Sequence, residues 1–173
     1  MKKYLIVVDM QNDFIDGSLG TPEAVDTVEY VKQKIISYPK ECVIATMDTH
    51  GDDYMETHEG KMLPVKHCIK GTEGWEISPE LKPCLEGAKI YEKPTFGCLE
   101  MANDLKAVSE KEDIEIELVG LCTDICVLSN ALLLRAFMPE AEISVDARCC
   151  AGVTPELHDA ALKTMQSCHI RVK

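Results

Sequence analysis

Short runs of apolar residues alternate along the chain with segments in which apolar residues recur every three or four positions. The runs indicate strands that are buried on both faces, and the spacing indicates helices that pack through one face. This alternation is typical of a parallel β-sheet covered by helices on both faces. The expected strands are residues 4–8, 42–46, 89–91, 114–119, 143–145 and 170–172.

Two of the expected helices carry clear start signals. Thr21-Pro22 and Thr154-Pro155 each combine an N-cap residue with a proline at the first helical position. Helical spacing predicts two further helices, over residues 101–108 and about 123–135. The last of these is so apolar that we expect it to be buried.

One connection is much longer than the others. Residues 51–88 join the second and third expected strands and contain no long periodic segment. Connections of this length inside a compact domain are usually functional or disordered. The presence of His58, His67 and Trp75 favours function.

The order of the elements predicts the topology. Right-handed crossovers turn six strand-helix units into a doubly wound α/β sheet with the strand order 3-2-1-4-5-6. In open parallel sheets, ligands bind beyond the carboxyl ends of the strands where the winding reverses. We therefore expect Asp9 and the turn from Gly120 to Cys126 to lie beside the binding crevice.

Length and charge narrow the range of partners. The 173 residues fit a single domain, and 18 Lys and Arg against 30 Asp and Glu give a net charge of -12. Such a charge disfavours binding to nucleic acid or to an anionic membrane surface. We find neither a signal segment nor an apolar run of membrane-spanning length, so we expect a cytoplasmic protein, which we also expect to be a homo-oligomer. The odd number of cysteines, nine, favours reduced and mostly buried thiols.

Three strand ends carry residues suited to nucleophilic chemistry. Cys126 begins a helix after a strand, where the helix dipole would lower the pKa of its thiol and favour the thiolate. Asp9 ends the first strand and is suited to take the thiol proton and return it to a leaving group. Lys93 ends the third strand, where its charge would hold the carboxylate ionised. Taken singly, each has a structural alternative: a buried cysteine, a carboxylate that caps a turn, and a surface lysine.

A second group of residues suits a metal ion. Asp48-Thr49-His50 ends the second strand, and side chains two apart on an extended segment point the same way. With His67 from the long connection, Asp48 and His50 offer a carboxylate and two imidazoles, which suit zinc, iron or manganese. The alternative is that both histidines make ordinary hydrogen bonds.

Three aromatic residues are candidate walls for a flat substrate. Phe14 follows Asp9 by five residues, Phe96 follows Lys93 by three, and Trp75 lies in the long connection. Apolar and aromatic side chains line most small-molecule pockets. Packing in the core is the alternative for each of them.

Three segments together resemble the motif blocks of the nicotinamidase/isochorismatase family, in the same order and over almost the whole chain. They are Val7–Phe14 (VVDMQNDF), Lys93–Phe96 (KPTF) and Gly120–Val127 (GLCTDICV). The resemblance implies that Asp9, Lys93 and Cys126 form a catalytic triad. It also implies a non-proline cis peptide before Cys122, and an oxyanion hole made by the backbone N-H groups of Cys122 and Cys126.

The resemblance also bears on the metal and the substrate. In metal-binding nicotinamidases an Asp-x-His pair and a later histidine hold the ion that binds the pyridine nitrogen, and Asp48, His50 and His67 match them. Isochorismatases lack this metal site. Two features depart from nicotinamidases: Gly51 stands where proline is usual, and the chain is short.

The leading functional hypothesis is hydrolysis of nicotinamide or a similar small carboxamide to the acid and ammonia, through a thioester on Cys126. Within the family, the rivals are isochorismatase-type ether cleavage and hydrolysis of another amide. A different class is a redox or binding protein that uses Cys122 with Cys126, or Cys149 with Cys150. The spacing of Cys122 and Cys126 is not that of a thioredoxin-like motif, which disfavours this class.

Overall fold

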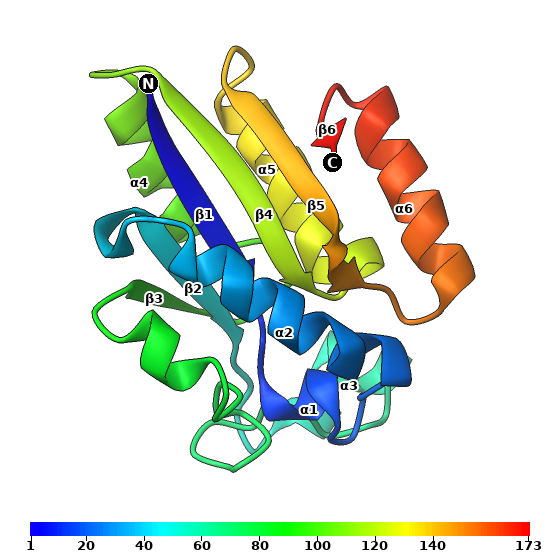
Figure 1. The fold of residues 1–173 in the computed structure, drawn as a ribbon. Helices are drawn as coiled ribbons and strands as arrows, with labels where there is room; N and C mark the ends of the chain where they lie inside the picture. Colours follow the sequence, from blue (N-terminus) through cyan, green and yellow to red (C-terminus); the bar gives the residue numbers. More distant parts are fainter.

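The structure is a computed structural model that describes residues 1–173. Its six strands form one parallel sheet in the order β3-β2-β1-β4-β5-β6, which confirms the predicted order and winding (Figure 1). The strands are β1 (Lys2–Val8), β2 (Val43–Asp48), β3 (Lys89–Lys93), β4 (Ile114–Leu121), β5 (Glu142–Ala151) and β6 (Arg171–Val172).

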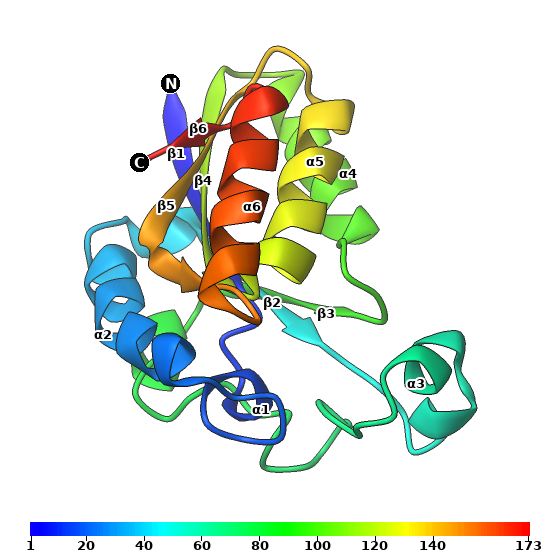
Figure 2. The ribbon, with the colours of Figure 1, turned by 90° about the vertical axis from the view of Figure 1, so that its right-hand side faces the viewer.

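Helices cover both faces of the sheet. They are α1 (Asn12–Ile15), α2 (Pro22–Ile36), α3 (His58–Met62), α4 (Leu99–Ser109), α5 (Leu128–Phe137) and α6 (Pro155–Ser167). Figure 2 shows α4, α5 and α6 on one face of the sheet and α2 on the other. The two predicted N-caps are present, because the hydroxyl groups of Thr21 and Thr154 accept hydrogen bonds from the backbone of the first turn of α2 and α6.

Alternation along β1 divides the core into two layers. Tyr4, Ile6 and Val8 pack into the cluster under α4, α5 and α6, whereas Leu5 and Val7 pack into the cluster under α2. Successive side chains of a strand point to opposite faces, so a run of apolar residues is needed when both faces are covered. Residues 4–8 of the central strand are therefore buried, and the buried carboxylate of Asp9 follows directly after them.

Two elements differ from the expected ones. The helix expected from residue 123 begins as a wide turn, η4 (Thr123–Val127), because the N-H groups of Ile125 and Val127 both donate to the carbonyl of Cys122. Strand β5 continues past its expected end at Val145, since its last residues pair with Gly120 and Leu121 of β4. The long connection contains α3 and single turns η2 (Tyr54–Glu56) and η3 (Lys82–Leu85), which are too short to produce a periodic signal.

The pairing register gathers the polar strand ends at one edge of the sheet. Val8 pairs with Gly120, and Asp48 pairs with Lys93. The carboxyl ends of the strands lie at the lower edge of the sheet in Figure 1, beside α1 and α3. The expected crevice therefore lies between the strand ends and the long connection.

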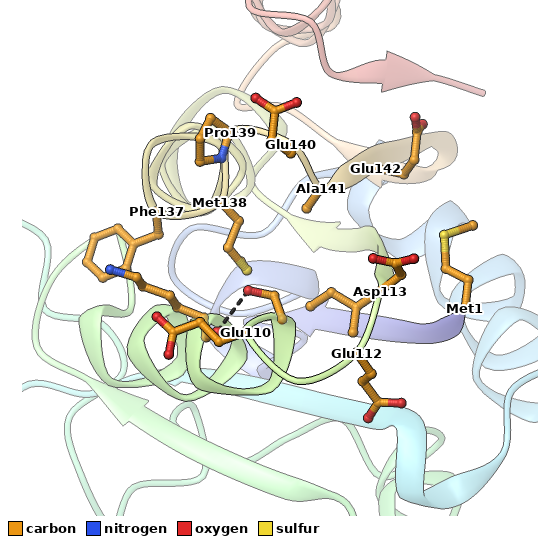
Figure 3. A pocket seen from close by; sticks show the side chains of 13 residues that line it. Met1, Glu110, Glu112, Asp113, Phe137, Met138, Pro139, Glu140, Ala141 and Glu142 are labelled. Atoms are coloured by element: carbon orange, nitrogen blue, oxygen red, sulfur yellow. Dashed lines mark hydrogen bonds between the residues drawn. The ribbon is translucent and has the colours of Figure 1, made fainter.

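A separate hollow of about 310 Å³ lies at the opposite, amino-terminal edge of the sheet (Figure 3). Carboxylates surround it, and they belong to Glu110, Glu112, Asp113, Glu140 and Glu142. None of the residues predicted for catalysis or metal binding lines it.

No helix of the chain has both the length and the apolar character needed to cross a membrane.

Gly120 is required where β4 approaches β1. Its φ is +118°, and a Cβ atom there would lie 2.1 Å from the carbonyl oxygen of Val8. We predict that Gly120→Ala lowers the free energy of unfolding by about 3 kcal/mol or more, because it adds a backbone clash to an unfavourable φ. Gly87→Ala is the matched control: its φ is +86° with nothing within 4 Å, so it should cost only about 1–2 kcal/mol. Urea unfolding measures both, and equal losses would contradict the role of the clash.

Candidate active site

The ammonium group of Lys93 is the meeting point of the site. Lys93 ends β3 and is 1% exposed. Its Nζ lies 2.7 Å from Oδ2 of Asp9, donates to Sγ of Cys126 at 3.4 Å and donates to the carbonyl of Thr95 at 3.0 Å. The structure therefore brings the three predicted strand-end residues together, and Lys93 is not the surface lysine of the alternative interpretation.

Asp9 is held in one orientation by its neighbours. It follows β1 with a positive φ of 47°, which turns the chain sharply at the end of the strand. Oδ1 accepts a hydrogen bond from the hydroxyl of Thr46 at 2.7 Å, and Oδ2 faces Lys93. The carboxylate is completely buried. It does not cap a turn, so its place beside the cation is its main interaction.

Asn130 holds the turn that carries Cys126. Its amide donates to the carbonyls of Cys126 at 2.8 Å and Phe96 at 3.1 Å, and its oxygen accepts from the N-H of Cys98 at 2.9 Å. One buried side chain thus joins the cysteine turn to the segment after Lys93. We did not predict this role from the sequence, although a polar residue within the apolar α5 was a signal that could have indicated it.

The backbone before the cysteine turn has the geometry that the family resemblance implies. The peptide bond between Leu121 and Cys122 is cis. The N-H of Cys122 makes no hydrogen bond within the protein. Cys122 also lines the same cavity as Cys126.

Burial is the largest influence on the protonation of these groups. It raises the pKa of Asp9, although the attraction of Lys93 opposes the shift. Burial, reinforced by Asp9, raises the pKa of the Cys126 thiol well above its usual value, and Lys93 only partly offsets this. Burial disfavours the ammonium of Lys93, but attraction to the carboxylate of Asp9 outweighs it, so the pKa of Lys93 is raised.

The expectation of a lowered thiol pKa is therefore wrong for the free protein. A helix dipole offers a modest stabilisation of an anion. At Cys126 the loss of solvent and the neighbouring carboxylate of Asp9 have the larger effect. The thiol thus begins as a neutral group that needs a base.

Four potential ligands for a metal ion lie next to the ammonium group. We call them the four-residue cluster, which consists of Asp48, His50, Glu59 and His67. Each residue offers one ligand atom, and these atoms all lie within 4.8 Å of one another. The structure thus brings together the three predicted ligands and adds Glu59 from α3. The sequence signal for Glu59 was weak, because an acidic residue in a long connection is usually exposed.

The ligand separations fit a transition metal. Nε2 of His50 lies 3.0 Å from Asp48 Oδ2 and 3.6 Å from Glu59 Oε1, and Nε2 of His67 lies 3.4 and 3.7 Å from the same atoms. Ligands about 2.0–2.1 Å from a tetrahedral zinc ion lie about 3.3 Å from one another. The donor set is nitrogen and oxygen, as zinc, iron and manganese accept. The side chains present fit such an ion.

The surroundings of the cluster orient its ligands. Nδ1 of His67 donates to the carbonyl of Val65 at 2.9 Å. In the neutral ring, Nε2 then carries the lone pair that can bind a metal ion. The buried ring of Tyr54 packs against both imidazoles, at 4.8 Å from His50 and 5.0 Å from His67. Burial disfavours ionised Asp48, but a hydrogen bond from His50 and the attraction of Lys93 oppose it, and the pKa of Asp48 is lowered.

A cavity of about 210 Å³ connects the cysteine and the cluster. It is smaller than the roughly 300 Å³ at which drug-sized pockets begin, so it suits a small ligand. The lining residues are Phe14, Leu19, Asp48, Glu59, Leu63, His67, Phe96, Cys122, Ile125, Cys126 and Val153.

Two of the three predicted aromatic walls line this cavity. Phe14 and Phe96 do so, and Phe96 remains 42% exposed at the surface. Trp75 does not: its indole N-H donates to Thr49 at 2.9 Å, and the ring lines a separate surface hollow. The path of the long connection, which the sequence pattern did not reveal, carries Trp75 to the far side of the end of β2.

Comparisons with known proteins identify relatives that share the fold. A profile of the isochorismatase domain matches residues 3–172. The crystal structure of nicotinamidase/pyrazinamidase PncA from Bacillus subtilis is 30% identical, with a TM-score of 0.80 and a match that covers 99% of each chain. Pyrazinamidase of Pyrococcus horikoshii, crystallised in complex with zinc, is 25% identical with a TM-score of 0.79 over 100% of this chain and 99% of that one. N-carbamoylsarcosine amidase from Thermoplasma acidophilum is 30% identical with a TM-score of 0.75 over 100% and 96% of the two chains.

The charges around Cys126 predict opposite effects when either partner is neutralised. Asp9→Asn removes the charge that disfavours the thiolate, so the thiol pKa should fall and alkylation by iodoacetamide should reach half its maximal rate at lower pH. Lys93→Met removes the stabilising ammonium, so this midpoint should move to higher pH. The pH profile of alkylation, followed by mass spectrometry of the peptide that contains Cys126, measures both. Shifts in the same direction would contradict this electrostatic account.

Proposed function

Because the chain belongs to the isochorismatase family, we propose that it is a cysteine hydrolase that cleaves a small, flat carboxamide to the acid and ammonia. Nicotinamide is the first candidate substrate. The observation that carries the proposal is the buried ammonium of Lys93 between Asp9 and Cys126. Cys126 in turn lines a small cavity that Asp48, Glu59 and His67 of the four-residue cluster also line.

The arrangement supports acid-base catalysis by Asp9 and nucleophilic attack by Cys126. Asp9 takes the thiol proton while the sulfur attacks the amide carbonyl carbon, and the N-H groups of Cys122 and Cys126 stabilise the negative oxygen. Asp9 then gives the proton to the leaving nitrogen, so that ammonia departs and a thioester remains. In the second half, Asp9 accepts a proton from water, which attacks the thioester carbonyl carbon. The carbon–sulfur bond breaks, and Asp9 returns the proton to the departing sulfur, so that the acid and the thiol are released.

The protonation states support these roles. A raised thiol pKa means that the nucleophile is uncharged before substrate binds, so a base beside it is needed. A raised pKa brings Asp9 closer to the working pH, where a group can both accept and donate a proton. The attraction of Lys93 limits this rise.

Asp48, His50, Glu59 and His67 are the residues that would hold a divalent transition metal, namely zinc, iron or manganese. A bound ion would offer a Lewis-acidic position to a ring nitrogen of the substrate. Glu59 is the most exposed of the four side chains, so it is the ligand that can leave most easily when substrate enters. The zinc complex of the pyrazinamidase from Pyrococcus horikoshii supports this assignment.

The cavity favours a small aromatic amide. Its volume is about 210 Å³, and its walls include Phe14 and Phe96. Aromatic walls of this kind suit a flat ring. The likeness to N-carbamoylsarcosine amidase favours a second candidate, a carbamoyl amide without an aromatic ring.

Ammonia release from a panel of amides tests the reaction and its nucleophile. We predict that the wild-type protein hydrolyses nicotinamide, and that Cys126→Ala lowers the rate by at least about a thousandfold because no other thiol takes its place. The panel should contain nicotinamide, pyrazinamide, benzamide and an N-carbamoyl amino acid. Turnover restricted to the last compound would favour the second candidate.

The matched control for the nucleophile is Cys122→Ala. This residue lines the same cavity, but its proposed role requires only its backbone N-H. The variant should therefore retain most of the activity. Comparable losses in Cys122→Ala and Cys126→Ala, with circular dichroism spectra like that of the wild type, would contradict the assignment.

Metal content and substrate choice should change together when a ligand is removed. We predict that the purified protein carries about one transition-metal ion per chain, and that His50→Ala loses it. The variant should lose more activity on nicotinamide than on benzamide, which has no ring nitrogen to bind. Elemental analysis and the two values of kcat/KM measure this. The metal assignment would be contradicted if the wild-type protein contained no metal after growth with added metal and if chelators did not change its activity.

A further inference from the structure

Gln11 joins two segments that supply the cluster and its surroundings. Its side chain is completely buried two residues after Asp9. Its amide oxygen accepts from the N-H of Asp48, and its amide nitrogen donates to the carbonyl of the same residue, each at 2.8 Å. The nitrogen also donates to the carbonyl of Trp75 at 2.8 Å. Gln11 thus fixes both backbone polar groups of Asp48 and anchors the long connection to them.

Asp13 makes a second contact of the same kind. Its Oδ2 accepts from the N-H of Cys68 at 2.8 Å, directly after His67. The carbonyl of Cys68 in turn accepts from the N-H of His50 at 2.9 Å. Gly74 makes room for the carboxylate, since a Cβ atom there would lie 2.2 Å from Asp13 Oδ2. The side chain therefore holds the segment of His67 beside that of His50.

These contacts matter because the cluster is assembled from distant parts of the chain. Asp48 and His50 lie at the end of β2, Glu59 lies in α3, and His67 lies in a segment without regular structure. A metal site requires its ligands within about 0.5 Å of their proper positions, and rotamers alone do not supply this when the backbones can move apart. The neighbours that orient ligands typically contribute about 10–100-fold to metal affinity.

We propose that Gln11 and Asp13 are positioning residues for the four-residue cluster, with Gln11 setting the backbone of Asp48 and Asp13 setting that of His67. This inference rests on the proposed metal site. Neither side chain belongs to the cluster itself. They lie on the segment that directly follows Asp9, so one short stretch of chain supplies the acid-base group and the supports of the metal ligands.

The alternative is that Gln11 only satisfies buried polar groups and stabilises the fold. Asn12 provides the matched control, because its amide donates to the carbonyl of Glu73 at 2.8 Å and so tethers the same connection without touching the cluster. A general loosening of the connection would follow from Asn12→Ala as well. A positioning role predicts an effect on metal affinity that is specific to Gln11 and Asp13.

The experiment measures the zinc dissociation constant of the full chain by competition with a chromogenic chelator. The variants are Gln11→Met, which keeps the size of the side chain and removes its hydrogen bonds, Asp13→Ala, and the control Asn12→Ala. We expect the first two to weaken zinc binding about 10–100-fold and the control to match the wild type. The kcat/KM for nicotinamide should also fall more than that for benzamide in Gln11→Met and Asp13→Ala.

Gln11→Glu covers the case in which Gln11→Met does not fold. It keeps the acceptor for Asp48 but places a carboxylate oxygen against two carbonyl oxygens, so it should also weaken zinc binding. Wild-type affinity in the Gln11 and Asp13 variants, or an equal loss in Asn12→Ala, would overturn the positioning role while leaving the metal site intact. A wild-type protein that does not bind zinc more tightly than Asp48→Ala would overturn the metal site, and this inference with it.

Discussion

The buried ammonium of Lys93 is the constraint on which the rest of the site depends. An unpaired charge in the protein interior costs several kcal/mol, so it persists only where opposite charges and hydrogen bonds surround it. Asp9 forms an ion pair with it at 2.7 Å, and a carboxylate oxygen of Asp48 lies 3.6 Å away. Cys126 and Thr95 accept hydrogen bonds from the ammonium group. The cation therefore holds two carboxylates and a thiol at fixed positions around one point.

The winding of the sheet supplies this environment at little structural cost. Because β1 lies at the centre with β2 on one side and β4 on the other, the ends of four strands surround the point where the winding reverses. Residues 4–8 of β1 are buried, and so is Asp9 directly after the strand. The loops beyond the strand ends cover the polar groups of the site. Asp9, Lys93 and Cys126 are buried because they lie at the end of the core.

This geometry explains which features the sequence predicted. Asp9, Lys93 and Cys126 could be placed together because parallel strands end at one edge, and the family resemblance assigned their roles. Trp75 and Glu59 could not be placed, because the path of the long connection depends on tertiary contacts rather than on periodicity. The raised pKa of Cys126 was missed because the helix dipole is visible in a sequence whereas the depth of burial is not. The homo-oligomer, the single domain and the cytoplasmic location stay predictions.

Asp48 makes the two halves of the site one electrostatic unit. Its Oδ1 faces Lys93 at 3.6 Å, while its Oδ2 lies 3.0 Å from His50 and 3.4 Å from His67. Burial and the carboxylate of Asp9 both disfavour a free thiolate on Cys126. In the proposed mechanism, the proton therefore stays on sulfur until the sulfur attacks a carbonyl group and the proton passes to Asp9. Such a site gives its nucleophile little reactivity in the absence of substrate.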